Sequence, residues 1–269
     1  MRAASGLLAW GDRLAVIQDD ALFFAFADCE TGLCHSAALP AVAGARTFDP
    51  ARGNKRVKPD LESLISVGER LVGLGSGSAP GRDRFALYPE LRWFDAGDLY
   101  RQLEEMSAFS GAQLNVEGAA VAGEEIWLFN RGNGVEPAVD ARCVVARAAF
   151  AAWLEGGPVP RAVFGEPWDL GSVEGVRLTL TDVALGSTDL FSAAAEDCPN
   201  AVDDGRVVGV AIGALADGGW TALLESGVPT TAKVEGLAWL GGRLFGVTDP
   251  DDPERPGELL EIALLGTWR

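Results

Sequence analysis

Short apolar runs separated by polar, glycine-containing turns follow one another along the whole chain. The clearest example is the segment 233–249, KVEGLAWLGGRLFGVTD, in which Glu235 precedes one apolar run and Asp249 ends a second. Gly241 and Gly242 separate the two runs. Apolar runs joined by a two-glycine turn are typical of a β-hairpin. The segment is therefore predicted to form two antiparallel strands with an acid at its start.

The same pattern recurs in four other places. Glu62 opens ESLISVGERLVGLGS, Glu117 opens EGAAVAGEEIWLFNR, and Ser5 opens SGLLAWGDRLAVIQD with a serine in place of the acid. A weaker fifth copy, TDVALGSTDLFSAAAED, is opened by Asp182. The opening positions 5, 62, 117, 182 and 235 lie 57, 55, 65 and 53 residues apart. Further strand-like runs separate the copies, so each repeat offers about four strands.

Such a repeat predicts an all-β fold, a β-propeller, with residues 1–269 as a single domain. Five repeats indicate five blades of about four antiparallel strands; a sixth blade would need a hidden repeat within 117–182. The last blade has few residues left, so either it has three strands or residues 258–268 bend into two. Helices are expected at 98–106 and, more briefly, at 148–156.

Composition and charge narrow the range of partners. The formal charge of -17 argues against a nucleic-acid partner, since phosphate binding needs a basic face. No apolar run approaches the roughly 18 residues of a membrane span, and the first residues lack the apolar stretch of a signal peptide. We therefore expect no membrane association and a cytoplasmic location. The sequence does not indicate an oligomeric state.

Two stretches resemble a known group of proteins. KPDLESL (58–64) and KVEGLAW (233–239) are similar to the repeated motif of phytase-like and SdiA-regulated-like bacterial β-propellers, and the repeat pattern is also similar to that of calcium-activated nucleotidases. In those families axial carboxylates hold calcium, and the phytases hydrolyse phosphate esters. The resemblance implies that Glu62, Glu117, Asp182 and Glu235 are calcium ligands. Ser5 departs from the acid pattern.

Physical chemistry gives an independent reason to expect a metal. In a ring of repeats, the four opening acids would converge on one axis, where like charges disfavour ionisation of each carboxyl group. Protonation, pairing with basic side chains, or a hard cation would relieve this repulsion. Ca²⁺ accepts six to eight oxygen ligands with loose geometry, whereas zinc prefers the histidine and cysteine that are absent from these positions. The alternative is that the acids bind backbone amides or channel water.

Basic and amide side chains near the same mouth are candidates for substrate binding. The second strand of each hairpin should end at this mouth, which places Asn130 and Arg131 there. The chain has only three lysines, and Lys58 and Lys233 each precede an opening acid closely. They are predicted to hold a phosphate or carboxylate next to the metal, or else to neutralise excess acid.

These observations lead to two functional hypotheses. The first is a calcium-dependent hydrolase, with phosphate esters as the substrate class, acting on a small anionic molecule at the channel mouth. The second is a non-catalytic propeller that binds a ligand or a protein partner. The sequence lacks a GxSxG motif and a P-loop, and it contains one histidine, His35.

Overall fold

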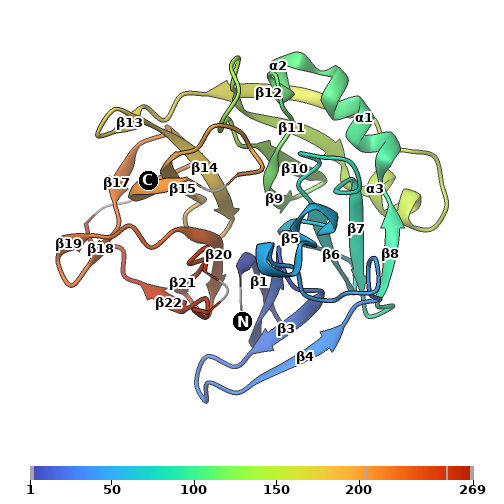
Figure 1. Ribbon diagram of the computed structural model, residues 1–269, viewed down its shortest axis with the longest axis horizontal. Helices are drawn as coiled ribbons and strands as arrows, with labels where there is room; N and C mark the ends of the chain where they lie inside the picture. The colour runs from blue at the N-terminus through green and yellow to red at the C-terminus, as the bar shows by residue number, and fades with distance from the viewer. Residues whose placement is uncertain (1–2, 204, 253, 267–269) are drawn as a thin grey trace.

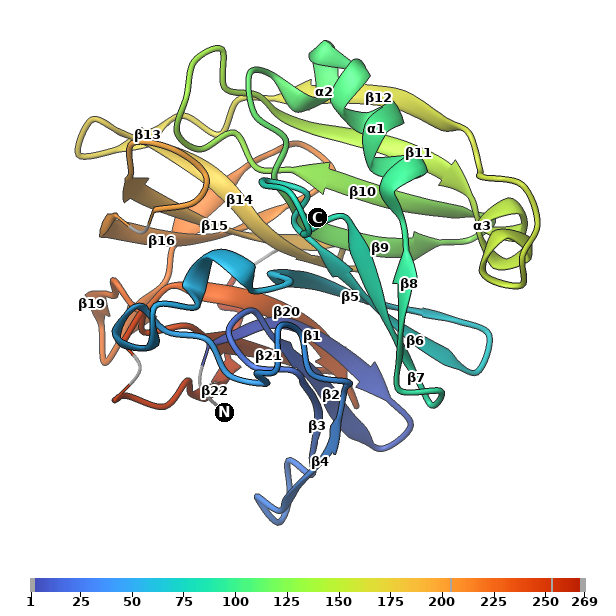
Figure 2. The ribbon, with the colours of Figure 1, turned by 45° about the vertical axis from the view of Figure 1, so that its right-hand side comes forward.

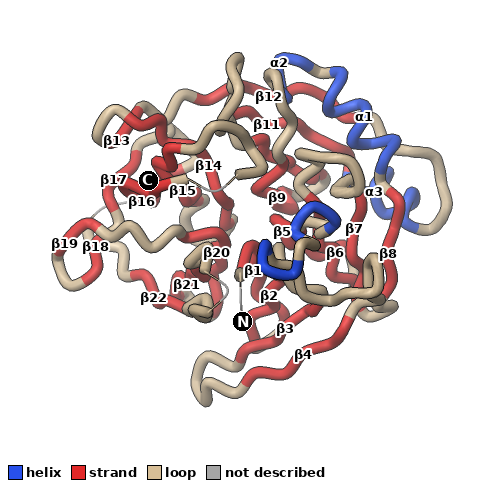
Figure 3. Tube along the Cα trace, viewed as in Figure 1, coloured by secondary structure: helices blue, strands red, loops and turns tan. Residues whose placement is uncertain are grey.

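The computed structural model describes residues 3–203, 205–252 and 254–266. Five small antiparallel sheets are arranged around a central axis, which confirms the predicted five-bladed β-propeller (Figure 1). The innermost strands of neighbouring sheets pack side by side around the ring. Figure 3 shows that helices are confined to the periphery and to one loop segment above the channel.

Blades 1 to 3 each contain four strands in simple meander order. Blade 1 contains β1 (Ala4–Trp10), β2 (Arg13–Gln18), β3 (Phe23–Ala27) and β4 (Cys34–Ala38). Blade 2 contains β5 (Leu61–Val67), β6 (Arg70–Gly75), β7 (Arg84–Tyr88) and β8 (Arg92–Asp95). Blade 3 contains β9 (Val116–Ala122), β10 (Glu125–Asn130), β11 (Asp140–Ala146) and β12 (Ala162–Trp168).

Blades 4 and 5 depart from this plan. Blade 4 has five strands, β13 (Ser172–Val173), β14 (Val176–Ala184), β15 (Leu190–Asp197), β16 (Arg206–Ala214) and β17 (Trp220–Ala222). A small hairpin, β18 (Leu224–Glu225) and β19 (Val228–Pro229), leads to blade 5. In the described residues blade 5 has three strands, β20 (Val234–Leu240), β21 (Arg243–Thr248) and β22 (Leu259–Ile262). The three-strand alternative is therefore the one observed.

The helices match the expected positions. α1 (Gly97–Glu105) and α3 (Arg147–Leu154) form where helices were predicted, and α2 (Ser107–Ser110) follows α1. Two 3₁₀ turns, Pro50–Arg52 and Lys55–Val57, precede blade 2. None of the helices in the described part of the chain is long and apolar enough to cross a membrane. Figure 2 shows α1 and α2 lying against the outer strands of blade 3.

The hydrophobic core is divided into five clusters, one at each interface between neighbouring blades. The largest lies between blades 2 and 3 and includes the side chains of α1, α2 and α3. The cluster between blades 5 and 1 contains Leu7 and Val16 from one end of the chain and Phe245 and Val247 from the other. One twisted sheet cannot cover both of its faces, so stacking of neighbours supplies the burial that stabilises every blade.

A β-bulge occurs at the same place in every innermost strand. In each, one residue is skipped in the pairing with the second strand. The skipped residues are Ser5, Glu62, Glu117, Thr181 and Glu235. A bulge leaves a residue unpaired and re-aims its side chain. The bulge therefore defines the ring of equivalent positions around the axis.

Candidate functional site: an acidic cavity on the propeller axis

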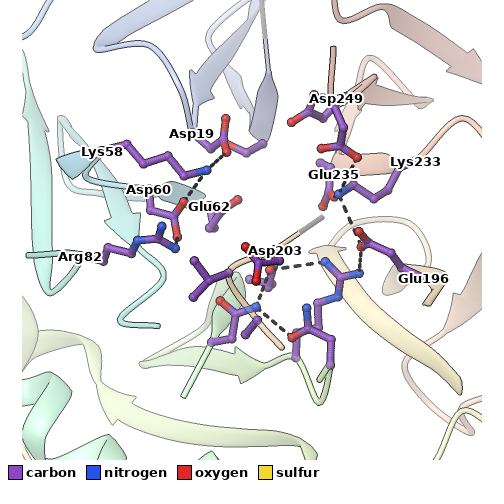
Figure 4. A pocket seen from close by; sticks show the side chains of 18 residues that line it. Asp19, Lys58, Asp60, Glu62, Arg82, Glu196, Asp203, Lys233, Glu235 and Asp249 are labelled. Atoms are coloured by element: carbon purple, nitrogen blue, oxygen red, sulfur yellow. Dashed lines mark hydrogen bonds and ion pairs between the residues drawn. The ribbon is translucent and has the colours of Figure 1, made fainter. Parts of the chain in front are cut away.

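Four of the five bulge residues, all but Thr181 of blade 4, line a cavity of about 50 Å³ at one end of the channel. Its lining is strongly charged, with nine carboxyl side chains and four basic ones (Figure 4). The carboxyl groups belong to Asp19, Asp60, Glu62, Glu117, Glu196, Asp203, Glu235, Asp249 and Asp251, and the basic groups to Lys58, Arg82, Arg131 and Lys233. The excess of acids favours protons or cations in the cavity.

The side of the cavity formed by blades 1 and 2 is built around Asp60. This residue precedes β5 in a left-handed backbone conformation, with φ of 57°, which Asp tolerates better than most residues. The Lys58 Nζ donates to Asp60 Oδ1 at 2.7 Å and also contacts Asp19 Oδ2. Arg82 and Ser76 donate to the other oxygen of Asp60. Asp19 directly follows β2 of blade 1, so Lys58 connects two blades.

Three carboxylates gather on this side. Each of Asp19, Asp60 and Glu62 offers one oxygen, and these oxygens all lie within 4.8 Å of one another. The Asp19 Oδ1 is buried and has no hydrogen-bond partner in the described structure. Burial is the main cause that raises the pKa of Glu62 well above its usual value, and the neighbouring Asp60, Glu117 and Asp19 add to it. A buried oxygen without a partner in a charged cavity fits an ion or a water at that point.

The opposite side is built around Arg131 and Lys233. The Arg131 guanidinium donates to Glu196 Oε2 at 2.6 Å and to Thr179 Oγ1 at 3.0 Å, and it lies 3.5 Å from Glu117 Oε1. The Lys233 Nζ lies 2.8 Å from Glu235 Oε1 and 3.6 Å from Glu196 Oε2. Glu235 Oε2 is buried and has no partner in the described residues. These contacts join blades 3, 4 and 5 at the axis.

The ionisation states of the acids differ because their partners differ. Burial raises the pKa of Glu117 to about 7 although Arg131 opposes the rise. Burial, reinforced by Asp19 and Asp251, raises the pKa of Asp249 to about 9. For Asp60 and Glu196, burial is outweighed by nearby basic groups, and both have a pKa of about 2. The cavity thus holds permanent anions beside carboxyl groups that are protonated near neutral pH.

Six of the eight residues predicted for the site line this cavity. They are Lys58, Glu62, Glu117, Arg131, Lys233 and Glu235. Asn130 lies outside the lining and links backbones instead, since its Oδ1 accepts from the Asn115 amide and its Nδ2 donates to the Val139 carbonyl, each at 2.7 Å. Both lysines that were expected at the mouth are buried and ion-paired.

Asp182 also lies outside the lining. Its Oδ2 accepts a hydrogen bond of 2.7 Å from the Leu237 amide of the next blade, and burial raises its pKa well above its usual value. The bulge position in this blade belongs to Thr181, whose Oγ1 donates to the Val234 carbonyl at 2.6 Å. Ser5 donates in the same way to the Leu61 carbonyl. The repeat in blade 4 is therefore shifted by one residue from the sequence alignment, and Asp182 binds a backbone amide.

Some residues near the cavity, Asp60 and Asn115 among them, were not assigned a role from sequence. Both lie two positions before a bulge, as the predicted Lys233 does, and Thr179 occupies this position in blade 4. A polar residue therefore recurs at this position in blades 2 to 5, and an alignment of the repeats would have revealed it as a candidate site position. Asp19 and Asp249 directly follow β2 and β21, and Glu196 lies at the end of β15, at the strand ends that were expected to face the mouth.

The fold and the site together define a five-bladed β-propeller with an acidic axial cavity. The model of a family described as "Family of unknown function (DUF6929)" matches residues 1–264, so the chain belongs to that family. No curated protein sequence matches it.

Similar solved structures are distant in sequence. The extracellular domain of a one-component system from B. thetaiotaomicron has a TM-score of 0.38 and 9% identity, covering 96% of this chain and 27% of that one. A gluconolactonase from Xanthomonas campestris has a TM-score of 0.45 and 14% identity, covering 99% of this chain and 78% of that one. The nidogen/laminin complex contains a chain with a TM-score of 0.39 and 10% identity, covering 91% and 72%. This chain therefore spans only about a quarter of the length of the first of these proteins.

Proposed function

We propose that the axial cavity binds a divalent cation, with Ca²⁺ as the first choice, through Asp19, Asp60 and Glu62. The close approach of their three oxygens is the observation that carries the proposal. The unpartnered Asp19 Oδ1 is a second, independent support. The lining offers oxygen donors and no histidine or cysteine, which matches the ligand preference of Ca²⁺ and not that of zinc.

The activity that we propose for this site is calcium-dependent hydrolysis of a small anionic substrate, with phosphate esters as the substrate class. A bound divalent cation polarises an ester oxygen and lowers the pKa of a coordinated water. Lys58 and Arg82 flank the three carboxylates, but both contact Asp60. An incoming anion therefore gains little from these two side chains until a cation takes up the carboxylate charge.

The size of the cavity limits what enters it. At roughly 10–15 Å³ per water, a volume of about 50 Å³ holds an ion with a few waters. Only the reacting group of a substrate would fit, with the remainder at the mouth. The same observation favours a second candidate function, in which the cation stabilises a non-catalytic propeller that binds a partner.

Calorimetric titration of the metal-free protein with Ca²⁺ tests the binding. We expect about one tight site, weakened at least tenfold by Glu62→Gln, which keeps the shape of the side chain and removes its charge. Glu225→Gln, an exposed substitution on β18, should bind like the unsubstituted protein. Asp182→Asn should also bind normally because its side chain contacts a backbone amide. Absence of Ca²⁺ binding, or equal binding by Glu62→Gln, would refute the metal site.

A hydrolase assay separates the two candidate functions. We expect p-nitrophenyl phosphate or bis-p-nitrophenyl phosphate to be hydrolysed with Ca²⁺, and the rate to fall to background with EDTA or with Glu62→Gln. Ca²⁺ binding without turnover of either ester would reject phosphate esters as the substrate class and leave the non-catalytic propeller.

A further inference from the structure

A second cavity, of about 170 Å³, lies at the other end of the central channel. Three successive residues from each of the five blades line it, at the ends of the innermost strands; in blade 4 the third of them, Leu185, directly follows β14. None of these lining residues is charged, and Ser66 is the polar member among them. The two cavities share no lining residue. The channel therefore has one acidic end and one apolar end.

The bulges fix which residues face this second cavity. Two positions after each bulge, all five strands carry buried apolar residues, namely Leu7, Leu64, Ala119, Val183 and Leu237. Four positions after each bulge lie half-buried residues, which we call the rim: Ala9, Ser66, Val121, Leu185 and Trp239. An apolar layer thus continues into a rim that is open to solvent on one side.

The position between acid and apolar layers is mostly glycine, at Gly6, Gly118 and Gly236. A Cβ added to Gly236 would lie 2.9 Å from the backbone nitrogen of Leu7, and one added to Gly6 would lie 3.2 Å from that of Leu64. The innermost strands therefore approach one another closely at this level. The tight layer separates the charged cavity from the apolar one.

The aromatic side chain of the rim is held in one orientation. Trp239 Nε1 donates to the Thr188 carbonyl at 2.9 Å. A Cβ on Gly186 would lie 2.3 Å from the Trp239 ring, so the indole fills the space that a side chain would take. Trp239 nevertheless remains half-buried and lines the cavity. A fixed, partly exposed aromatic ring loses little entropy when a ligand packs against it.

We propose that this apolar end of the channel binds a small uncharged molecule, an aromatic ring or a short aliphatic chain. An engineered protein cavity of about 150 Å³ with a similar aliphatic lining binds benzene, so the volume and the lining suit this class. Ser66 supplies one hydroxyl for a polar end of the ligand. The proposal is independent of the function of the acidic cavity.

Titration with benzene and with 1-hexanol tests this site, followed by calorimetry and by tryptophan fluorescence. We expect saturable binding of at least one probe, weakened tenfold or more by Leu185→Asp. Ser66→Asp, at a rim position that is already polar, provides a second charged variant if Leu185→Asp does not fold. Leu224→Asp, on the exposed hairpin β18–β19, is the matched control and should bind normally. Trp239→Phe should abolish the fluorescence response.

The outcomes that overturn the proposal are specific. Binding of neither probe would exclude this ligand class, and unchanged affinity in both rim variants would place the probes elsewhere. A concentration-dependent doubling of mass that Leu185→Asp abolishes would assign the rim to contact between two copies of the chain. Ca²⁺ titration should be unaffected by the rim variants, so failure here is distinguishable from failure of the metal site.

Discussion

The basic side chains at the axis act between blades. Lys58 lies before the innermost strand of blade 2 and contacts Asp19 of blade 1. Lys233 directly precedes the innermost strand of blade 5 and lies 3.6 Å from Glu196 of blade 4. In both pairs burial opposes the charged lysine, but the carboxylates outweigh it and hold the lysine pKa well above its usual value. These contacts support the charge-balancing interpretation of the lysines; a role in holding an anionic ligand remains a prediction.

Replacing Lys58 by alanine should therefore destabilise the metal-free protein. Breaking a buried ion pair costs roughly 3–5 kcal/mol, because the carboxylates lose their partner. We expect that loss in urea unfolding with EDTA, and partial recovery with Ca²⁺. Arg56→Ala, an exposed neighbour, should change stability little. A Lys58→Ala protein with normal stability and weakened binding of an anionic substrate would instead assign the lysine to ligand binding.

At the scale of the element, the bulge and the glycine after it shape each innermost strand. The bulge turns a side chain such as Glu235 into the cavity, and Gly236 lets the strand pack against β1 of the neighbouring blade. The position after the bulge is Ser63 in blade 2 and Asp182 in blade 4. In blade 4 the carboxyl group at this position bonds the Leu237 amide of blade 5. The residue directly after the bulge thus sets the contact between each of these innermost strands and the next blade.

Gly236→Ala tests this contact. The added methyl group would meet Leu7 backbone and Val247 Cγ2, at 2.9 and 2.7 Å, and the backbone has little freedom to move. We expect a loss of about 1–3 kcal/mol, as is usual for an overpacked core. Gly73→Ala is the matched control, since its Cβ would make ordinary contacts of 3.4 Å and longer. Equal denaturant midpoints for the two variants would contradict close packing at the axis.

At the scale of the whole molecule, the ring closes without exchange of strands among residues 3–266, apart from the undescribed 204 and 253. Blade 1 is formed by the first four described strands and blade 5 by the last three, and they meet through a shared apolar cluster. Arg243 of β21 also lies 2.9 Å from Glu30 of blade 1, on the surface. Exposed ion pairs contribute little to stability. The apolar cluster between blades 5 and 1 therefore supplies most of the free energy that closes the ring. Each blade packs against two neighbours, so the acids at the axis, which join the blades, affect the stability of the whole ring.

The stability of the metal-free protein should depend on pH in a defined way. Glu117 and Asp249, with pKa values of about 7 and about 9, bind protons more tightly in the folded state. Their stabilisation of the folded state is complete below the ordinary carboxyl pKa of about 4. It is lost as the pH rises through about 7 for Glu117 and about 9 for Asp249. Asp60 and Glu196, with pKa values of about 2, stabilise the folded state fully above pH ~4. This stabilisation is lost as the pH falls through about 2.

We therefore expect the Tm in EDTA to be higher near pH 5 than at pH 9, measured by differential scanning calorimetry. Ca²⁺ should raise the Tm more at pH 9, where the carboxylates are ionised, than at pH 5. Glu117→Gln should reduce the fall in Tm between pH 5 and pH 9. A Tm in EDTA that increases steadily from pH 5 to pH 9 would show that the acids are not protonated in the fold.

The sequence by itself determined the architecture and part of the site. Apolar runs, two-residue turns and a regular spacing are local properties, and they sufficed to predict five blades, two helices and three of the acids on the axis. Glu62, Glu117 and Glu235 were found because the turn that follows each strand has two residues, so counting back from the turn reaches the bulge.

The tertiary structure alone decided the remaining features. In blade 4 the acid Asp182 was taken as the opening residue, but the bulge lies one residue earlier, at Thr181, and the turn between Ala184 and Leu190 has five residues in place of two. The cluster of Asp19 with Asp60 joins strands of two blades, and no local pattern encodes such a distance. Whether a buried carboxyl keeps its proton depends on which basic groups the packing brings beside it. That balance of burial against charge exists only once the ring has closed.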